Sequence, residues 1–200
     1  MKTPLILSFQ FMTDHTFLQI LENDSGLTDI PATHDWLKEN KKSIELKLEE
    51  HGAILFKDLP TETAEDFDQF VSTFNYDTFT YEESLSNAVR INKTSKVFTA
   101  NEAPREVEIF LHHEMAQTPS YPKNIFFFCK SASETGGETP LCRSDQLYEA
   151  LLREDKTLVE SFEKFGVIYN SIMSSGDELI SGQGRSWQKT LGVSSKNGAE

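Results

Sequence analysis

The stretch Leu111-His112-His113-Glu114-Met115 guides the interpretation of the whole chain, together with Gly136-Gly137-Glu138-Thr139 downstream. In an extended strand, the side chains of residues i and i+2 point to the same face. His112 and Glu114 can therefore aim a nitrogen and an oxygen at one point, while His113 points away. This is two-thirds of a 2-His-1-carboxylate triad, the type of site that leaves open positions on non-haem Fe(II).

Taken alone, the His-x-Glu pair has a simpler interpretation. Short motifs match by chance, and a surface histidine beside a glutamate is usually just solvated. The chain has five histidines and none after His113. His113 is a poor substitute for a second imidazole ligand, because adjacent side chains on a strand face opposite ways. The pair therefore needs support from its surroundings.

Neighbouring motifs supply that support. They follow one another in a fixed order around the His-x-Glu pair: Thr99–Pro104, Tyr121-Pro122, Ile125–Cys129 and Gly136–Pro140. This order resembles the TauD/TfdA family of Fe(II)- and 2-oxoglutarate-dependent dioxygenases, and the His-x-Glu form is similar to its clavaminate-synthase-like branch. The resemblance runs from about Pro4 to Trp187 and is densest between Val97 and Ser144.

The fold expected from these features is α+β. Strand pieces with helices clustered near the start and after the glycine loop predict that class. The resemblance implies a double-stranded β-helix (jelly roll) with flanking helices. The family's second histidine and the arginine that follows it have no counterpart here. We therefore expect residues 1–200 to be a single TauD/TfdA-like domain, its N-terminal portion, with the distal part missing; a short protein that has lost iron chemistry is the alternative.

The resemblance assigns roles to three residues. His112 and Glu114 would be ligands of Fe(II), the metal cofactor, with 2-oxoglutarate as cosubstrate. The Thr139 hydroxyl would contact a 2-oxoglutarate carboxylate, since a hydroxyl can donate to a carboxylate without adding charge. Gly136 and Gly137 would allow the tight backbone path that brings Thr139 inward; the alternative is that they simply form a turn.

Three further residues are expected in the substrate pocket. Asn101 and Glu102 match a segment that lines the pocket in the family. Arg90 is included because the family often carries an arginine near this position, although a surface arginine is the alternative. The pocket's specificity does not follow from these residues.

The function implied is that of an oxidoreductase. It would oxidise an unactivated C–H of a small, amino-acid-like substrate, with release of succinate and CO2. The alternative is a non-catalytic remnant of the fold that acts as a binding or scaffold protein. Unpaired strand edges would then favour self-association. A plain acidic interaction module would require the motif agreement to be accidental.

Composition limits the partners. The net charge of −13 argues against nucleic acid and anionic membranes, which both favour basic surfaces. Cys129 and Cys142 match no disulfide framework, zinc site or redox motif. No apolar run approaches the roughly 20 residues that span a bilayer, and no signal-peptide cleavage site follows the N-terminal residues. We expect a soluble, cytoplasmic protein with a small-molecule substrate.

Apolar spacing predicts several helices. The first runs from about residue 34 to 50, with Thr33 or Asp35 as N-cap and Gly52 beyond its end. The second follows the N-cap candidates of residues 61–63 and carries a core-facing stripe: Phe67, Phe70, Val71 and Phe74. Ser144 is expected to cap a third helix, and a fourth presents three large apolar residues before Gly166: Leu158, Phe162 and Phe165.

Short apolar runs predict strands. They are expected at Leu5–Leu7, Ala53–Phe56, Ile109–Glu114 and Val167–Tyr169. Ile125–Cys129 is apolar at every position, which is typical of a strand that is covered on both faces.

Overall fold

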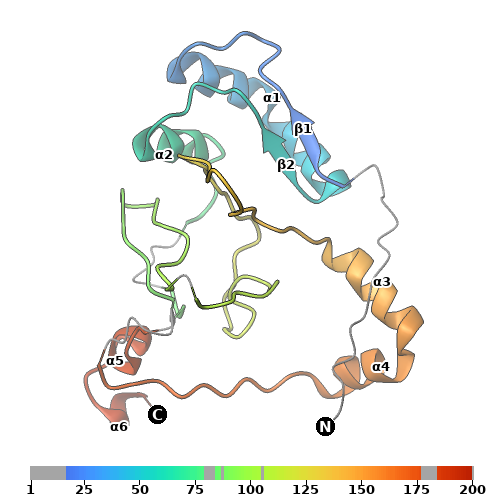
Figure 1. Cartoon of the computed structure of the whole chain (residues 1–200), viewed down its shortest axis with the longest axis vertical. Coiled ribbons are helices and arrows are strands. Elements are labelled where there is room, and N and C mark those ends of the chain that lie inside the picture. The colour runs from blue at the N-terminus through green and yellow to red at the C-terminus, as the bar shows by residue number, and fades with distance from the viewer. Residues whose placement is uncertain (1–16, 79–83, 87, 105, 177–183, 200) are drawn as a thin grey trace.

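The computed structural model describes residues 17–78, 84–86, 88–104, 106–176 and 184–199 (Figure 1). This part of the chain contains helices and one two-stranded sheet, in agreement with the predicted mixture of helices and strands. The strand expected at Leu5–Leu7 lies outside the described residues. The elements are β1 (Gln19–Leu21), α1 (Ile30–His51), β2 (Ile54–Phe56), α2 (Ala64–Ser72), α3 (Ser144–Glu154), α4 (Lys156–Phe165), α5 (Trp187–Leu191) and α6 (Lys196–Ala199).

The first helix, α1, starts earlier than its predicted N-caps. Asp29 caps it, and its carboxylate accepts from the Ala32 amide at 2.8 Å. Pro31 fits the first turn, where its missing N–H costs no hydrogen bond. Thr33 is instead a buried residue inside the helix. The helix ends as predicted at Gly52, whose φ of 76° is left-handed.

The two strands and α1 form one βαβ unit. β1 pairs in parallel with β2, with Gln19 opposite Ile54 and Leu21 opposite Phe56. Parallel strands need a long crossover connection, and α1 supplies it. The strand predicted around β2 is confirmed, although Leu55 at its centre is 43% exposed. Ile20 and Leu55 are both more than 40% exposed, so the described residues cover mainly the other face of this small sheet.

The second helix, α2, has an N-cap among the predicted candidates and part of the predicted core face, since the helix ends at Ser72 and Phe74 lies beyond it. The Thr63 hydroxyl accepts from the Asp66 amide, and the Asp66 carboxylate accepts from the Thr63 amide. Such a reciprocal capping box satisfies two backbone donors at the N-terminus. The core between α2 and α1 consists of four buried side chains: Leu37, Ile44, Phe70 and Phe74.

The apolar run Ile125–Cys129 does not form a strand in the described structure. Phe126 lies 5.3 Å from Phe74 and Phe128 lies 5.3 Å from Phe67, measured between ring centroids. Ile125 is 52% exposed and Phe127 is 59% exposed. The segment therefore covers α2 with alternate side chains, and the prediction of a strand covered on both faces is wrong here. Within the described ranges, no sheet ladder includes it.

The helices α3 and α4 pack against each other, and their ends differ from prediction. Ser144 is the first residue of α3 and makes no cap; the N-cap position is Arg143. Asp155 caps α4 through the Leu158 amide. Val159 is the buried residue of α4, whereas its large apolar residues are 46%, 52% and 75% exposed: Leu158, Phe162 and Phe165.

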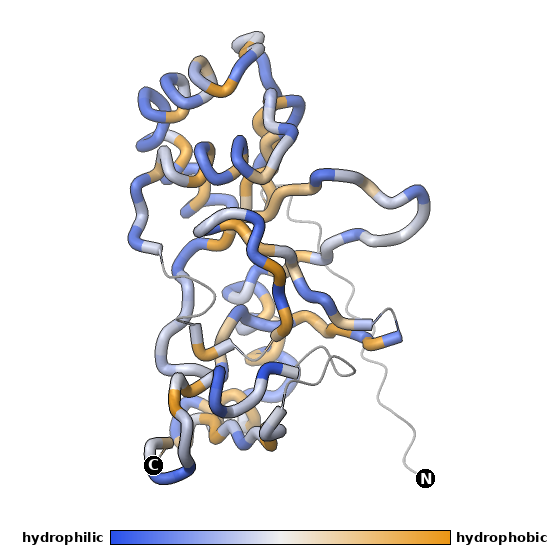
Figure 2. The backbone as a smooth tube through the Cα atoms, turned by 90° about the vertical axis from the view of Figure 1, so that its left-hand side faces the viewer, coloured by the Kyte–Doolittle hydropathy of each residue, from blue (hydrophilic) through white to orange (hydrophobic). Residues whose placement is uncertain are grey.

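Beyond α4, residues 166–176 continue as an extended segment (Figure 1), and the Trp187 amide at the start of α5 donates to the Ser174 carbonyl. Val167–Tyr169 forms no strand there, contrary to prediction. Orange, hydrophobic stretches occur on irregular segments in the middle of the molecule as well as on helices (Figure 2). Of the helices in the described ranges, none has both the length and the apolar character needed to cross a bilayer.

Candidate functional site

The His-x-Glu pair lies where an irregular segment enters a turn, not on a strand. Glu114 begins this turn, and the Ala116 amide donates to the His113 carbonyl at 3.2 Å. Met115 adopts a left-handed φ of 58°, and its side chain is buried. The predicted strand at 109–114 is therefore absent from the described structure, and the turn, rather than strand alternation, sets the directions of these side chains.

His112 and Glu114 nevertheless face each other. His112 Nε2 lies 3.8 Å from Glu114 Oε2. The other ring nitrogen, Nδ1, lies 2.7 Å from the Phe110 carbonyl oxygen. Since a carbonyl only accepts, Nδ1 is assigned as the donor, and in the neutral ring Nε2 keeps its lone pair. This is the arrangement in which histidine binds a metal while its second nitrogen is held by the protein.

His113 has a different partner. Its Nε2 lies 2.9 Å from the Ser144 hydroxyl at the start of α3. Ser144, which was expected to cap α3, instead bonds His113, and this contact connects the turn at residues 114–117 to that helix. The hydrogen bond of His113 is therefore separate from the contact between His112 and Glu114.

Arg90 approaches Glu114 from another part of the chain. Its Nη2 donates to Glu114 Oε1 at 3.1 Å, and the two side chains are 15% and 26% exposed. Its Nη1 donates to the carbonyl oxygens of Thr99 and Ala100. The guanidinium also lies 5.4 Å from the centroid of the Phe98 ring, within the range of a cation–π contact.

These contacts belong to an irregular hairpin formed by residues 89–102. The Thr99 amide donates to the Ile91 carbonyl and the Glu102 amide to the Val89 carbonyl, each at 3.0 Å. Asn101 is half-buried, and its Oδ1 accepts from the Ala103 amide at 3.1 Å, while the Glu102 side chain is exposed. The structure thus brings Arg90 to Glu114 and places Asn101 and Glu102 on the same hairpin.

The glycine loop has the expected backbone, but among the described residues it makes no hydrogen bond to His112 or Glu114. Gly136 and Gly137 have φ values of 67° and 78°, which favour glycine. A Cβ on Gly137 would lie 2.6 Å from the Ser133 hydroxyl, so a larger residue would have to displace that side chain. Thr139 is exposed, and among the described residues no hydrogen bond joins it to His112 or Glu114.

The pair fits two positions of an Fe(II) site. Imidazole nitrogen and carboxylate oxygen are the donors of such sites. However, the described ranges contain no group of three or more His, Cys, Asp or Glu side chains that could hold a metal ion. The described residues alone therefore bring together two donors of the kind that such a site uses, one fewer than its three protein ligands. Cys129 is exposed and Cys142 is half-buried, and both are free thiols.

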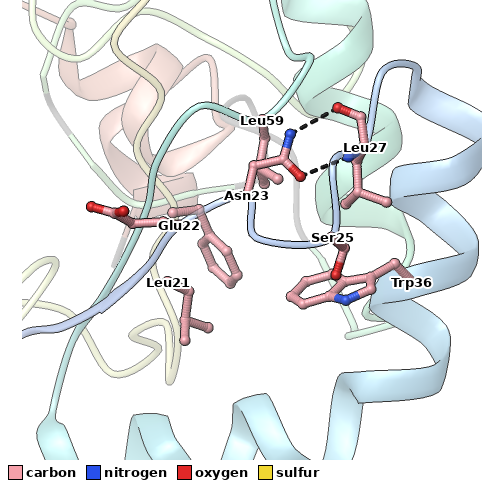
Figure 3. A pocket seen from close by; sticks show the side chains of 8 residues that line it. Leu21, Glu22, Asn23, Ser25, Leu27, Trp36 and Leu59 are labelled. Carbon is pink, nitrogen blue, oxygen red and sulfur yellow. Dashed lines mark hydrogen bonds between the residues drawn. The ribbon is translucent and has the colours of Figure 1, made fainter.

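A small pocket elsewhere belongs to the βαβ unit. It lies between β1, α1 and the segment after β2, and Asn23 exchanges two hydrogen bonds with Leu27 beside it (Figure 3). Leu21, Trp36 and Leu59 form its apolar wall. Neither His112 nor Glu114 lines it, so we assign it to packing.

Comparison with known proteins identifies the family. Residues 21–186 match the family model described as taurine catabolism dioxygenase TauD, TfdA family. The chain belongs to the TauD/TfdA family. Over 171 residues it is 34% identical to a clavaminate synthase-like protein of Arabidopsis thaliana, covering 86% of this chain and 51% of that protein. Over 154 residues it is 29% identical to the dapdiamide synthesis protein DdaC of Enterobacter agglomerans, covering 76% of this chain and 43% of DdaC.

The predicted resemblance to TauD/TfdA proteins is thereby confirmed, and the family implies a jelly-roll type of fold and a dioxygenase-like oxidoreductase. The chain spans about half the length of the relatives that it matches. The contact of Arg90 with Glu114 is the site feature that sequence reasoning missed. The two residues are 24 positions apart, and no spacing rule connects them.

Proposed function

We propose that this chain contributes the His-x-Glu half of the metal site of an Fe(II)- and 2-oxoglutarate-dependent dioxygenase. Family membership supports the class. The observation that carries the proposal is the approach of His112 Nε2 to Glu114 Oε2 at 3.8 Å, with His112 Nδ1 held by the Phe110 carbonyl. The His112 side chain is 57% exposed, so a metal at its Nε2 would remain accessible to further ligands.

Each residue has a defined role in this proposal. His112 offers Nε2 to the metal because its Nδ1 hydrogen is engaged. Glu114 offers Oε2, since Arg90 occupies Oε1. When bound, Fe(II) with 2-oxoglutarate would supply the oxidation of an unactivated C–H, with release of succinate and CO2. Thr139 would donate to a 2-oxoglutarate carboxylate, and Asn101, Glu102 and Arg90 would lie near the substrate.

We further propose a jelly-roll architecture for the complete domain and a small, amino-acid-like substrate. The family supports the architecture. One relative is named clavaminate synthase-like and the other a dapdiamide synthesis protein, and these names are in keeping with a small-molecule substrate.

A metal titration tests the proposal. The purified chain is titrated with Co(II), which stands in for air-sensitive Fe(II), and binding is followed by calorimetry and visible absorption. His112→Ala should weaken binding at least about ten-fold, because a direct ligand is lost. His113→Ala is the matched control, since it removes the adjacent imidazole that bonds Ser144. Equal binding by the wild type and the His112→Ala variant would contradict the proposal.

A second candidate function is a non-catalytic binding or scaffold protein with this fold. It is favoured by the finding that the described residues bring together two metal donors rather than three. The same titration separates the candidates. A chain that binds Co(II) independently of His112, or not at all, would support the scaffold.

A further inference from the structure

Several contacts within the protein fix the Arg90 side chain. Its Nη1 donates to two backbone carbonyls of the hairpin, those of Thr99 and Ala100, and its Cζ lies 5.4 Å from the centroid of the Phe98 ring. It is only 15% exposed. A guanidinium fixed in this way presents its second terminal nitrogen, Nη2, in one direction, and Glu114 Oε1 lies in that direction at 3.1 Å.

The contact divides the two oxygens of Glu114 between two partners. Oε1 accepts from Arg90, and Oε2 faces His112 Nε2 at 3.8 Å. A free carboxylate can rotate and can bind a metal through one oxygen or both. A charge-assisted hydrogen bond to one oxygen restricts that rotation and leaves the other oxygen available.

We propose that Arg90 is a positioning residue, which holds Glu114 so that Oε2 and His112 Nε2 converge on a divalent metal. This inference rests on the proposed function, because it assigns the metal to these two atoms. It changes the expected role of Arg90 from contact with substrate to orientation of a ligand. Hydrogen-bond partners that orient metal ligands typically raise metal affinity by roughly ten- to a hundred-fold.

Electrostatic repulsion between Arg90 and the metal would have the opposite effect on metal affinity. The guanidinium is a permanent cation beside a proposed dication, so its charge alone disfavours the metal. If repulsion dominated, removal of Arg90 would tighten metal binding. If positioning dominates, removal weakens it. The direction of the change therefore distinguishes the two effects.

The first arm of the test needs no metal. Thermal unfolding midpoints are compared for the wild type, Arg90→Gln, Glu114→Gln and the double variant. Positioning requires the two side chains to interact in the folded chain, so the double variant should lose less stability than the two single variants together. Additive changes would overturn the proposal whether or not the protein binds metal.

The second arm measures Co(II) affinity and the Co(II) absorption spectrum at saturation. Arg90→Gln should bind roughly ten- to a hundred-fold more weakly, and Arg90→Lys should fall between it and the wild type, because an ammonium cannot reproduce the planar fork. The saturated Arg90→Gln spectrum should also change, because Glu114 is then free to bind through both oxygens. A general loss of packing would weaken binding without altering the spectrum of the saturated site.

Arg185→Gln is the matched control. Arg185 also donates to backbone carbonyls, those of Ser84, Ser86 and Lys189, and its replacement removes the same charge. The Arg185→Gln variant should keep the Co(II) absorption spectrum of the wild type. Unchanged or tighter Co(II) binding by Arg90→Gln would overturn the positioning role. Coupling between Arg90 and Glu114 without His112-dependent Co(II) binding would instead overturn the proposed metal function and leave their pairing intact.

Discussion

Tyr76 shows how a single residue links the core to a charged group. Its hydroxyl donates to Glu45 Oε1 at 2.8 Å, and its ring lies 5.6 Å from that of Phe74. Burial of the phenol and the bond to Glu45 raise the pKa of Tyr76 to about 12. The folded state therefore keeps this proton at a pH where the unfolded chain, with an ordinary tyrosine pKa near 10, releases it.

This pKa shift predicts a loss of stability at alkaline pH. A raised pKa contributes stability that is complete below pH 10 and is lost as the pH rises towards about 12. Tyr76→Phe should cost about 1–2 kcal/mol near neutral pH, since a bond to a charged acceptor is lost, and it should flatten the decline above pH 10. Urea unfolding at several pH values measures both effects. An equally steep decline in the variant would rule out Tyr76 as its source.

At the scale of elements, α1 contributes most to the core, and its two faces differ sharply. Leu37 is 1% exposed, and Ile44, two turns further along, is 4% exposed. Leu46 in the same helix is 57% exposed. The contrast follows from the helical period, which places these residues on opposite sides.

We expect Leu37→Ala to lower the free energy of unfolding by about 2–5 kcal/mol, because it leaves a cavity between α1 and α2. Leu46→Ala is the matched control: it deletes the same atoms from the same helix at an exposed site, and its effect should stay within about 0.5 kcal/mol. Chemical denaturation followed by circular dichroism measures both. Similar losses for the two variants would contradict the assigned packing of α1.

At the scale of the molecule, large apolar side chains lie exposed on segments without a sheet partner among the described residues. Five of them come from two segments of the sequence, residues 110–111 and 121–127, and we call this set the exposed strip: Phe110, Leu111, Tyr121, Ile125 and Phe127, which are between 52% and 71% exposed. Exposed apolar patches and unpaired extended segments favour association with another chain.

We therefore propose that the chain self-associates through the exposed strip. Sedimentation velocity over a range of concentrations should show a growing average mass. Replacing Phe110 and Phe127 together by serine should shift association to higher concentration, whereas Leu46→Ser, on exposed α1 surface, should not. A monomer at every concentration, or an equal effect of both changes, would contradict this assignment.

Catalytic competence also depends on the whole chain. We expect the 200 residues alone to produce no succinate from 2-oxoglutarate with Fe(II), ascorbate and oxygen. They contain no histidine after His113, and the family's distal arginine, a strong charge-assisted partner of a carboxylate, has no counterpart. Thr139 would contribute only about 1 kcal/mol through a neutral hydrogen bond. Succinate formed by the chain and abolished by His112→Ala would show that another group completes the site.

Several features were determined by the sequence itself. The motif order around His112 and Glu114 predicted the family, which the comparisons confirm. The stripe of Phe67 to Phe74 predicted the core face of α2, and Gly52 predicted the end of α1. These features are local: helical period, capping and left-handed glycine depend on residues a few positions apart, so the chain's own order contains the information.

Other features were decided only by tertiary structure. The apolar sequence of Ile125–Cys129 predicts a buried strand. A strand forms only where another segment satisfies its backbone hydrogen-bonding groups. In the described structure, alternate side chains of this segment pack on α2 instead. Likewise, nothing near Arg90 in the sequence indicates its contact with Glu114, because folding of the 89–102 hairpin brings the two together. Such contacts join residues far apart in sequence, and only the path of the folded chain determines them.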